Sequence, residues 1–485
     1  MLRLVWLWPA LATLAVGLYR IGTPVLWHDE LATVSVINRP VGSIVAMLRN
    51  VDAVHGVYYL SLHGWATVFG HSPTALRMPG VLAMTAAAAC VALTGRRLFG
   101  ARAGLAGGLA FALLPTVGRY AQEIRSYAFV VLAASAAALL LLRALERPTV
   151  LRWAGYAAAM TAAGYVHLVS LVVVLPHALA VALDWWRSRN RRVPLGFVLA
   201  FLTAVAAVYP LIRLGERQAA RQIGWILVPT GHDLAAIWAQ ILGGTMVTAA
   251  VVVLAALSFG GGNLRSAVLA TVMAAVPVLA IWEISRQASV SYFMPKYLFF
   301  TLPAWAVVAG AGLAAVRWRG TVTGLAALAL VALPDVRAMH QPLSHAAYTY
   351  PVEVTWFTPL DYRAAAAIVE QGYRPGDGIA FGQQRYALWW GVDTGTWYYL
   401  PNRIRPRDVL AGLSARERDD LWPTSCGDPA GCLGPEPRIW LVSKDDGTDP
   451  MATVSEAAEG VLRQRYATAE VHRVSGMTVA LLVRR

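Results

Sequence analysis

Long apolar stretches alternate with short polar loops through residues 1–334. A helix that crosses a bilayer needs roughly 20 mostly apolar residues. Residues 153–186 are too long for one such helix and short for two, and His167 and Ser170 interrupt them near the middle. We expect two short helices that meet near His167. With them the chain has about eleven predicted spans, the others at residues 4–20, 79–95, 103–119, 126–143, 194–213, 233–257, 267–284, 297–316 and 320–334.

Basic residues collect in a few short loops between these stretches. The four clusters are at residues 96–102, 143–152, 187–192 and 317–319. All four fall on one side of the membrane only if residues 153–186 form two helices. Short loops rich in Arg and Lys usually face the cytoplasm. We therefore expect a multi-pass protein of the cell membrane with a cytoplasmic N-terminus, and with loop 21–78 and the C-terminal part outside.

The composition also indicates a membrane protein. Of the 485 residues, 57% are hydrophobic and 14% are charged, whereas soluble domains have about 25% charged residues. The net charge of +14 is uneven, because residues 1–334 hold 25 basic and 9 acidic residues while residues 335–485 hold 16 and 18. The positive charge thus belongs to the apolar part of the chain, and we expect no nucleic-acid partner.

The last 151 residues have a different pattern. Residues 335–360 are rich in Pro, His and Tyr and are typical of a linker. From residue 361 the pattern predicts a small extracytoplasmic α/β domain, 361–485. Its predicted helices are 361–370 and 452–466, its predicted strands are 379–381 and 438–442, and 471–473 with 477–483 form a predicted hairpin. No phosphate-binding loop is present, so recognition of an acceptor or partner and a structural cap over the active site are the two interpretations of this domain.

Two cysteines enclose a short loop in the C-terminal domain. Cys426 and Cys432 are six residues apart, and a disulfide between them fits an oxidising compartment. Two unrelated free cysteines are the alternative interpretation. Cys90 lies inside an apolar stretch, where an unreactive core thiol is expected.

Polar residues that suit catalysis gather in the outer loops. The first loop contains Asp29 and Glu30 directly after the first span, then Asp52, His55, Tyr58 and Tyr59. The later motifs are Leu76-Arg77-Met78-Pro79, Gln122-Glu123-Ile124-Arg125-Ser126-Tyr127 and Pro295-Lys296-Tyr297. An Asp-Glu pair alone is common and often caps a helix. The combination of these motifs in this order is more specific.

Together these motifs resemble the GT-C glycosyltransferases of the protein mannosyltransferase and aminoarabinose transferase superfamily, and most of all an actinobacterial mannosyltransferase-like branch. The resemblance covers residues 20–130 well and 285–315 more loosely. It departs at Asp52, where one extra residue precedes His55 and the family's prolines are missing. It departs again at Lys296, where arginine is commoner. The C-terminal domain cannot be aligned with the family residue by residue.

The resemblance implies a membrane domain, 1–334, of GT-C type with loop 21–78 as its catalytic loop. It also implies transfer of a sugar, mannose by the branch resembled, from a polyprenyl-phosphate donor to a glycan or glycoconjugate of the cell envelope. Asp29 matches the family's catalytic Asp and would act as general base, with Glu30 orienting the acceptor. One base without a carboxylate nucleophile implies inversion at the anomeric carbon.

The remaining candidate residues have supporting roles in this scheme. The cations Arg125, Lys296 and Arg77 would bind the donor phosphate, and contact with lipid headgroups is the alternative for each of them. The residues expected to bind substrate or support the site are Asp52, His55, Tyr58, Glu123 and Tyr127. A divalent metal ion is an open option, because histidines and carboxylates crowd loop 21–78, but no ligand set is assigned.

Two other functions compete with this enzyme. A flippase or transporter of lipid-linked glycans is the first, although transporters tend to show inverted repeats and broken helices, and no convincing repeat is present here. A catalytically inactive envelope-assembly protein of the same fold is the second, and the departures at Asp52 and Lys296 leave it open.

Overall fold

The computed structural model describes residues 4–343, 358–382, 391–444 and 448–485. Contacts within the chain divide it into two units. The first unit consists of Met1–Gly22 and Asp52–His340, and the second of Thr23–Val51 and Gln341–Arg485. Residues 344–357 of the predicted linker lie outside the described residues.

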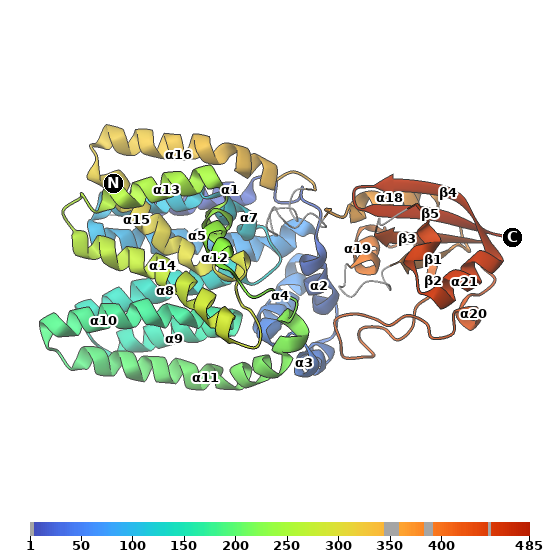
Figure 1. Ribbon diagram of the computed structural model, residues 1–485, viewed down its shortest axis with the longest axis horizontal. Coiled ribbons are helices and arrows are strands. Elements are labelled where there is room, and N and C mark those ends of the chain that lie inside the picture. The colour runs from blue at the N-terminus through green and yellow to red at the C-terminus, as the bar shows by residue number, and fades with distance from the viewer. Residues whose placement is uncertain (1–3, 344–357, 383–390, 445–447) are drawn as a thin grey trace. The chain divides into compact units, whose positions relative to one another are not determined.

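The first unit is helical (Figure 1). Its α-helices are α1 (Leu7–Leu18), α4 (Gly56–Phe69), α5 (Pro73–Phe99), α6 (Ala101–Leu113), α7 (Pro115–Ala121), α8 (Tyr127–Glu146), α9 (Val150–Val166), α10 (Val174–Ser188), α11 (Arg192–Ile223), α12 (Gly231–Leu242), α13 (Thr245–Ser258), α14 (Leu264–Gln287), α15 (Leu302–Ala315) and α16 (Trp318–Met339). Short 3₁₀ turns join some of them, namely η2 (Ala53–His55), η3 (Leu168–Val173), η4 (Pro295–Tyr297) and η5 (Phe299–Thr301).

The predicted multi-span membrane protein is confirmed. Among the described residues, six helical segments are long and apolar enough to cross a membrane, or up to eight if two bent pairs count as one span each. The bent pairs are α6 with α7, at 65°, and α12 with α13, at 90°. This number is below eleven because α1, α9 and α15 have only 12, 17 and 14 residues. They lie where the sequence predicts the remaining spans.

Small residues let the membrane helices approach closely, as is usual in lipid, where dispersion contacts replace the hydrophobic effect. Gly107 on α6 and Gly310 on α15 face each other, so that a methyl group on Gly310 would overlap the backbone of Gly107. On the same helix, a methyl group on Gly312 would overlap the Leu254 carbonyl of α13. The α6–α15 and α13–α15 contacts therefore depend on glycine.

The four basic loops lie at one end of the helical unit. Arg97, after α5, pairs with Glu146 at the end of α8. Arg102 donates to the Thr321 hydroxyl of α16 at 2.7 Å. The α13–α14 connection lies beside them, because Asn263 donates to the Leu98 carbonyl at 3.0 Å. At the start of α14, Arg265 donates to the Leu183 carbonyl near the end of α10 at 3.3 Å, so that the α10–α11 loop lies at the same end. The break at His167 between α9 and η3 makes this arrangement possible, as the sequence predicts.

The second unit contains a five-stranded sheet of order β2-β1-β3-β5-β4 (Figure 1). The strands are β1 (Gly378–Gly382), β2 (Arg407–Asp408), β3 (Arg438–Lys444), β4 (Tyr466–Val474) and β5 (Met477–Arg484). β2, β1 and β3 run parallel, and β5 and β4 add an antiparallel hairpin. The predicted strands and hairpin are confirmed, whereas the two-residue β2 is too short for a sequence pattern to reveal.

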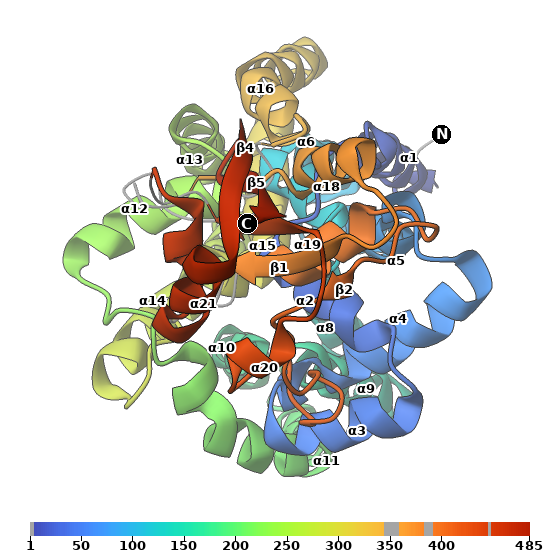
Figure 2. The same cartoon turned by 90° about the vertical axis from the view of Figure 1, so that its right-hand side faces the viewer.

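Helices cover both faces of this sheet (Figures 1 and 2). α21 (Glu456–Arg465) packs on one face over alternate residues such as Ile439 and Leu441. α18 (Tyr362–Gly372) and α19 (Val392–Tyr399) contact each other and the other face, where Phe381 meets the Trp397 ring. The result is the α/β layer fold predicted for the C-terminal domain.

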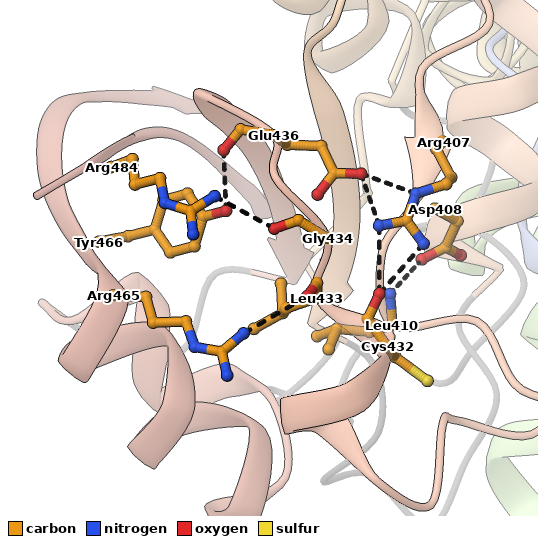
Figure 3. A network of polar contacts seen from close by, with 10 residues as sticks. All are labelled: Arg407, Asp408, Leu410, Cys432, Leu433, Gly434, Glu436, Arg465, Tyr466 and Arg484. Carbon is orange, nitrogen blue, oxygen red and sulfur yellow. Dashed lines mark hydrogen bonds and ion pairs between the residues drawn. The ribbon is translucent and has the colours of Figure 1, made fainter.

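A polar network fixes the loop that leads into β3 (Figure 3). This loop follows the short helix α20 (Pro429–Cys432) and contains two prolines. Its backbone carbonyls are satisfied by side chains: Arg407 donates to Cys432 at 3.0 Å, Arg465 to Leu433 at 3.3 Å, and Arg484 to Gly434 at 3.3 Å. Cys432 forms a disulfide with Cys426, the pairing that fits an oxidising compartment.

The second unit also includes the front half of the first loop. This segment forms α2 (His28–Ile37) and α3 (Val41–Asn50). The Leu26 N–H donates to the Tyr399 hydroxyl of α19 at 2.9 Å. Arg39 donates to the Asp420 carbonyl at 2.7 Å, and Asn50 to the Asp419 carbonyl at 3.2 Å. Residues 23–51 therefore fold with the C-terminal unit rather than with the membrane helices.

Candidate active site

A buried polar turn separates α7 from α8. Its first residue, Gln122, donates its side-chain amide to the carbonyls of Gly17 and Tyr19, at 2.9 and 2.7 Å. Glu123 forms an ion pair with Arg119 at 2.9 Å, and both side chains are fully buried. Because desolvation of two buried charges is costly, each of these side chains depends on its close contact with the other. The turn is thus held rigidly, and it presents Arg125.

Arg125 lies in a hydrogen-bonded chain with the back half of the first loop. It donates to the Tyr59 hydroxyl at 3.1 Å, and its other terminal nitrogen is 3.2 Å from His55 Nε2. The Tyr59 hydroxyl donates in turn to the Asp52 carboxylate. Burial, followed by the negative charge of Asp52, raises the pKa of Tyr59 well above its usual value. Tyr59 therefore stays protonated and links the cation to the carboxylate.

The end of α11 holds Asp52 from the other side. Gln222 donates to Asp52 at 2.9 Å, and Gln218 accepts the Ala53 N–H at 2.9 Å. Asp52 has φ 61°, in the left-handed region that non-glycine residues adopt rarely but that Asp tolerates better than most. Its side-chain and backbone partners fix this conformation where the chain enters the first unit.

Lys296 and His167 complete the polar cluster. Both are buried, and the positive charges of Lys296 and Arg125 act on the His167 ring. His167 also lies against aromatic residues: its ring centroid is 4.9 Å from that of Tyr297 and 6.3 Å from that of Tyr127. The short turn η4 positions Lys296, because Pro295 starts it and fixes the backbone.

A large apolar cavity adjoins this cluster. Its volume is about 480 Å³. His55, His167, Gln222 and Glu216 contribute polar groups to its wall, and Tyr297 lies beside them. The Glu216 carboxylate forms an ion pair with Arg213 at 2.9 Å. The rest is mostly aliphatic, with Val54, Leu168, Leu171, Ile212, Ile281 and Ile284 among the lining residues. The arrangement combines apolar walls with nearby cations, and it therefore suits an amphipathic anion that carries a long hydrocarbon chain.

Tyr58 lines a second apolar cavity of about 420 Å³, together with Trp65, Leu82 and Phe129. Its ring packs edge-on against that of Phe129, with centroids 5.9 Å apart. Its neighbour Tyr59 belongs to the polar cluster instead, because successive residues of a helix point in different directions.

The other predicted residues, Arg77, Asp29 and Glu30, make contacts of their own. Arg77 is fully buried on α5 and donates to the Ile21 carbonyl at 2.8 Å. Asp29 and Glu30 are in the first turn of α2, in the second unit. The buried Glu30 carboxylate accepts the Trp27 N–H at 3.3 Å and so caps α2, while Asp29 is partly exposed and 3.6 Å from the His28 ring. Among the described residues, no group of three metal-ligating side chains converges.

Part of the sequence matches a protein-family model. Residues 57–213 match the family described as dolichyl-phosphate-mannose-protein mannosyltransferase. A sequence comparison with curated proteins finds no match.

The chain also resembles solved structures over nearly its whole length. ArnT from Cupriavidus metallidurans, in the apo state, gives a TM-score of 0.60 at 15% identity, with 98% of this chain and 97% of that chain covered. ArnT bound to undecaprenyl phosphate gives 0.60 at 14% identity, with the same coverage. The oligosaccharyltransferase of Archaeoglobus fulgidus gives 0.47 at 11% identity, covering 98% and 72%. The chain has the GT-C fold.

The matched family region contributes much of the cluster within this GT-C fold. Residues 57–213 run from α4 to α11 and include Tyr59, Arg125 and His167. They end before Gln218 and Gln222, which hold Asp52 and the start of η2. The match also begins after Asp29 and Glu30.

The roles of several site residues are not predicted from the sequence. Tyr59 is part of the Tyr-Tyr motif, but the pattern does not distinguish it from Tyr58. Gln218 and Gln222 lie four residues apart and so share a face of α11, and this spacing is their one signal. His167 is visible only as a polar interruption of an apolar stretch, which predicts the helix break but not its place beside Arg125 and Lys296.

Proposed function

We propose that this protein transfers a sugar, mannose by family resemblance, from a polyprenyl-phosphate donor to a cell-envelope glycan or glycoconjugate. The observation that carries the proposal is the apolar cavity of about 480 Å³ beside Arg125, His55, His167 and Lys296. A polyprenyl phosphate has the matching chemistry, with a long hydrocarbon tail and an anionic head. The binding of undecaprenyl phosphate by ArnT, which shares the fold, supports this donor class.

In this mechanism the cations stabilise the leaving group. As the bond between sugar and phosphate breaks, negative charge grows on the phosphate, and fixed cations lower the energy of that state. Arg125 and Lys296 are the residues we assign to this role. The chain Arg125–Tyr59–Asp52 keeps the Arg125 guanidinium in one orientation, since Asp52 is itself held by Gln222. The contact of Arg77 with Ile21 favours a structural role for Arg77.

Asp29 is the proposed general base. A carboxylate that is partly exposed accepts a proton from an acceptor hydroxyl more readily than one committed to a cap. Asp29 is the partly exposed member of the pair, while Glu30 caps α2 and fixes the helix that presents Asp29. The acceptor oxygen then attacks the anomeric carbon, the bond to the phosphate oxygen breaks, and Asp29 takes the proton. Single displacement gives inversion.

We also propose that the basic loops face the cytoplasm and that the C-terminal unit lies outside. The four basic loops lie together at one end of the helical unit, as the positive-inside rule requires of cytoplasmic loops. The Cys426–Cys432 disulfide supports an oxidising compartment for the C-terminal unit.

A transport function is the second candidate, because the structure contains broken helices. The bent pairs α6–α7 and α12–α13 and the break at His167 are features that transporters use to build binding sites near the midplane. A transporter of lipid-linked glycans would bind the same lipid and would move it across the bilayer without cleaving the bond between sugar and phosphate.

The deciding experiment measures transfer by purified protein in nanodiscs. The substrates are radiolabelled polyprenyl-phosphate mannose, or the arabinose analogue, and a short mannoside acceptor. We expect transfer by the wild type and a loss of about 10²–10⁴-fold in rate for Asp29→Asn. Glu470→Gln is the matched control, because this carboxylate is 57% exposed, and it should leave the rate unchanged.

Two results would contradict the proposal. If labelled donor is bound but never consumed, while reconstituted vesicles show its movement between leaflets, the protein is a transporter. If neither donor is bound or consumed, the assembly function without catalysis is favoured. Equal transfer by wild type and Asp29→Asn would contradict the assignment of the base alone.

A further inference from the structure

The break between α9 and η3 is stabilised by its own backbone and side-chain contacts. His167 has an extended backbone, with φ −168° and ψ 107°, and η3 begins at the next residue. A broken helix at membrane depth leaves backbone groups without partners unless other groups satisfy them. Here the Ser170 hydroxyl lies 2.7 Å from the His167 carbonyl and 3.1 Å from the Ala163 carbonyl, and the Ser170 N–H donates to His167 at 3.0 Å. The break is thus a fixed feature that sets the direction of one side chain.

That side chain reaches the wall of the large cavity. His167 is 7% exposed, and within the described part of the chain its Nδ1 atom has no hydrogen-bond partner. Leaving a buried ring nitrogen without a partner costs free energy, and polar groups of this kind are usually satisfied. The neighbouring charges are the cations Arg125 and Lys296. A partner brought by a ligand at this point is therefore expected to be anionic.

We infer that His167 binds the phosphate of the lipid donor, with Nδ1–H donating a hydrogen bond to a phosphate oxygen between Arg125 and Lys296. This inference rests on the proposed function. A sugar hydroxyl fits less well, because two cations beside the ring favour an anion over a neutral group. A neutral imidazole has one N–H group, which can donate a directional hydrogen bond to the phosphate without adding a third positive charge to those of Arg125 and Lys296. His167 is then a binding residue that the motif pattern does not reveal.

Binding of two matched lipids tests the inference. The probes are a polyprenyl monophosphate and the corresponding polyprenol, which has the same tail and no phosphate, each titrated into protein in nanodiscs. We expect His167→Leu to weaken binding of the phosphate about tenfold to a hundredfold, the range for a hydrogen bond to a charged group, and to leave polyprenol binding unchanged. His167→Asn should stay within about threefold of wild type, because the amide nitrogen of Asn lies near the position of Nδ1.

Two further variants keep the test decisive if the leucine variant folds poorly. His167→Gln has a similar polarity, but its amide nitrogen lies near Nε2, so we expect it to lose affinity for the phosphate. His177→Leu is the matched control. His177 is a buried histidine on α10. Its Nδ1 lies 3.0 Å from the Tyr156 hydroxyl, and the residue lines a different, small cavity. It should bind both lipids as the wild type does.

The outcomes separate this inference from the proposed function. A parallel loss for phosphate and alcohol in His167→Leu would show that the ring only shapes the apolar wall and would overturn the inference. Unchanged phosphate binding in both the leucine and glutamine variants would overturn it as well, while the proposed donor would stand. If wild type binds the polyprenol as tightly as the phosphate, the donor assignment itself fails, and this role of His167 fails with it.

Discussion

The fold of the second unit disfavours the charged form of the Asp408 carboxyl group. Burial, reinforced by the negative charge of Asp393, raises the pKa of Asp408 to about 6, although its carboxylate accepts the Leu410 N–H at 3.0 Å. Figure 3 shows this contact beside Arg407, whose guanidinium points to Glu436 and Cys432. An aspartate in an unfolded chain has a pKa near 3.8. The folded unit therefore holds this proton more tightly than the unfolded chain does.

The second unit should consequently be more stable at about pH 5 than at about pH 7.5. As the pH falls, Asp408 binds its proton at a higher pH in the folded protein than in the unfolded chain. The free-energy cost of its buried negative charge therefore disappears as the pH falls from about 7 to about 4. Over that full range the change is roughly 2–3 kcal/mol for a shift of this size, and about half of it falls between about pH 7.5 and about pH 5. Asp408→Asn should remove this dependence and protect β1 and β2 at about pH 7.5. Hydrogen exchange of their amides, compared with wild type at the same pH, measures it.

An exposed carboxylate provides the control for this prediction. Glu456 begins α21 on the surface of the same unit, and Glu456→Gln should leave the exchange of β1 and β2 unchanged at both pH values. If Asp408→Asn accelerates exchange at about pH 7.5, the charged carboxylate stabilises the fold and the stated direction is wrong.

At the scale of elements, helix crossings in the first unit depend on individual glycines. α15 crosses α13 where Gly312 meets the Leu254 carbonyl, and added atoms there force the two backbones apart. We expect Gly312→Ala to cost about 1–3 kcal/mol, the usual range for overpacking, and to lower the melting temperature of the protein in detergent.

Gly64→Ala on α4 is the matched control. A methyl group there meets no atom within 4 Å, so it should be neutral or slightly stabilising, since alanine favours helix more than glycine. Equal melting temperatures for the two variants would contradict the predicted crossing.

The elements also show how far a single sequence predicts this fold. The apolar stretches identify the membrane helices, and the break near His167 follows from length, polar residues and loop charge. The strands 379–381 and 438–442 are evident because they are short apolar runs between turns. The bends in α6–α7 and α12–α13 are not predicted, since each lies within one continuous apolar stretch. The place of Gln222 beside Asp52 is not predicted either, because 170 residues separate them and only tertiary packing brings them together.

At the scale of the whole molecule, the candidate groups are distributed over two separately packed units. The phosphate-binding candidates Arg125 and Lys296 belong to the helical unit, and the base candidate Asp29 belongs to the unit that contains the C-terminal sheet. Arg39 fastens the Asp29 helix within its unit. This side chain is 5% exposed, its Nε donates to the Ser35 carbonyl at 3.2 Å, and its terminal nitrogen donates to the Asp420 carbonyl at 2.7 Å. The C-terminal unit is thereby linked to the proposed chemistry through α2.

Arg39→Ala should reduce sugar transfer without weakening donor binding. Removing the guanidinium leaves the Asp420 carbonyl without this donor and frees the end of α2, and misplacing a catalytic group by about 1 Å can cost roughly a hundredfold in rate. We expect a fall in kcat of about tenfold to a hundredfold, with affinity for polyprenyl phosphate within about twofold of wild type. Arg39→Lys should recover little, because an ammonium group cannot reproduce the guanidinium fork that reaches both Ser35 and Asp420.

The matched control is Arg49→Ala on the exposed surface of α3, which should transfer sugar normally. Loss of donor affinity in Arg39→Ala would show instead that the phosphate site depends on the second unit, and unchanged transfer would show that α2 keeps its position without this anchor.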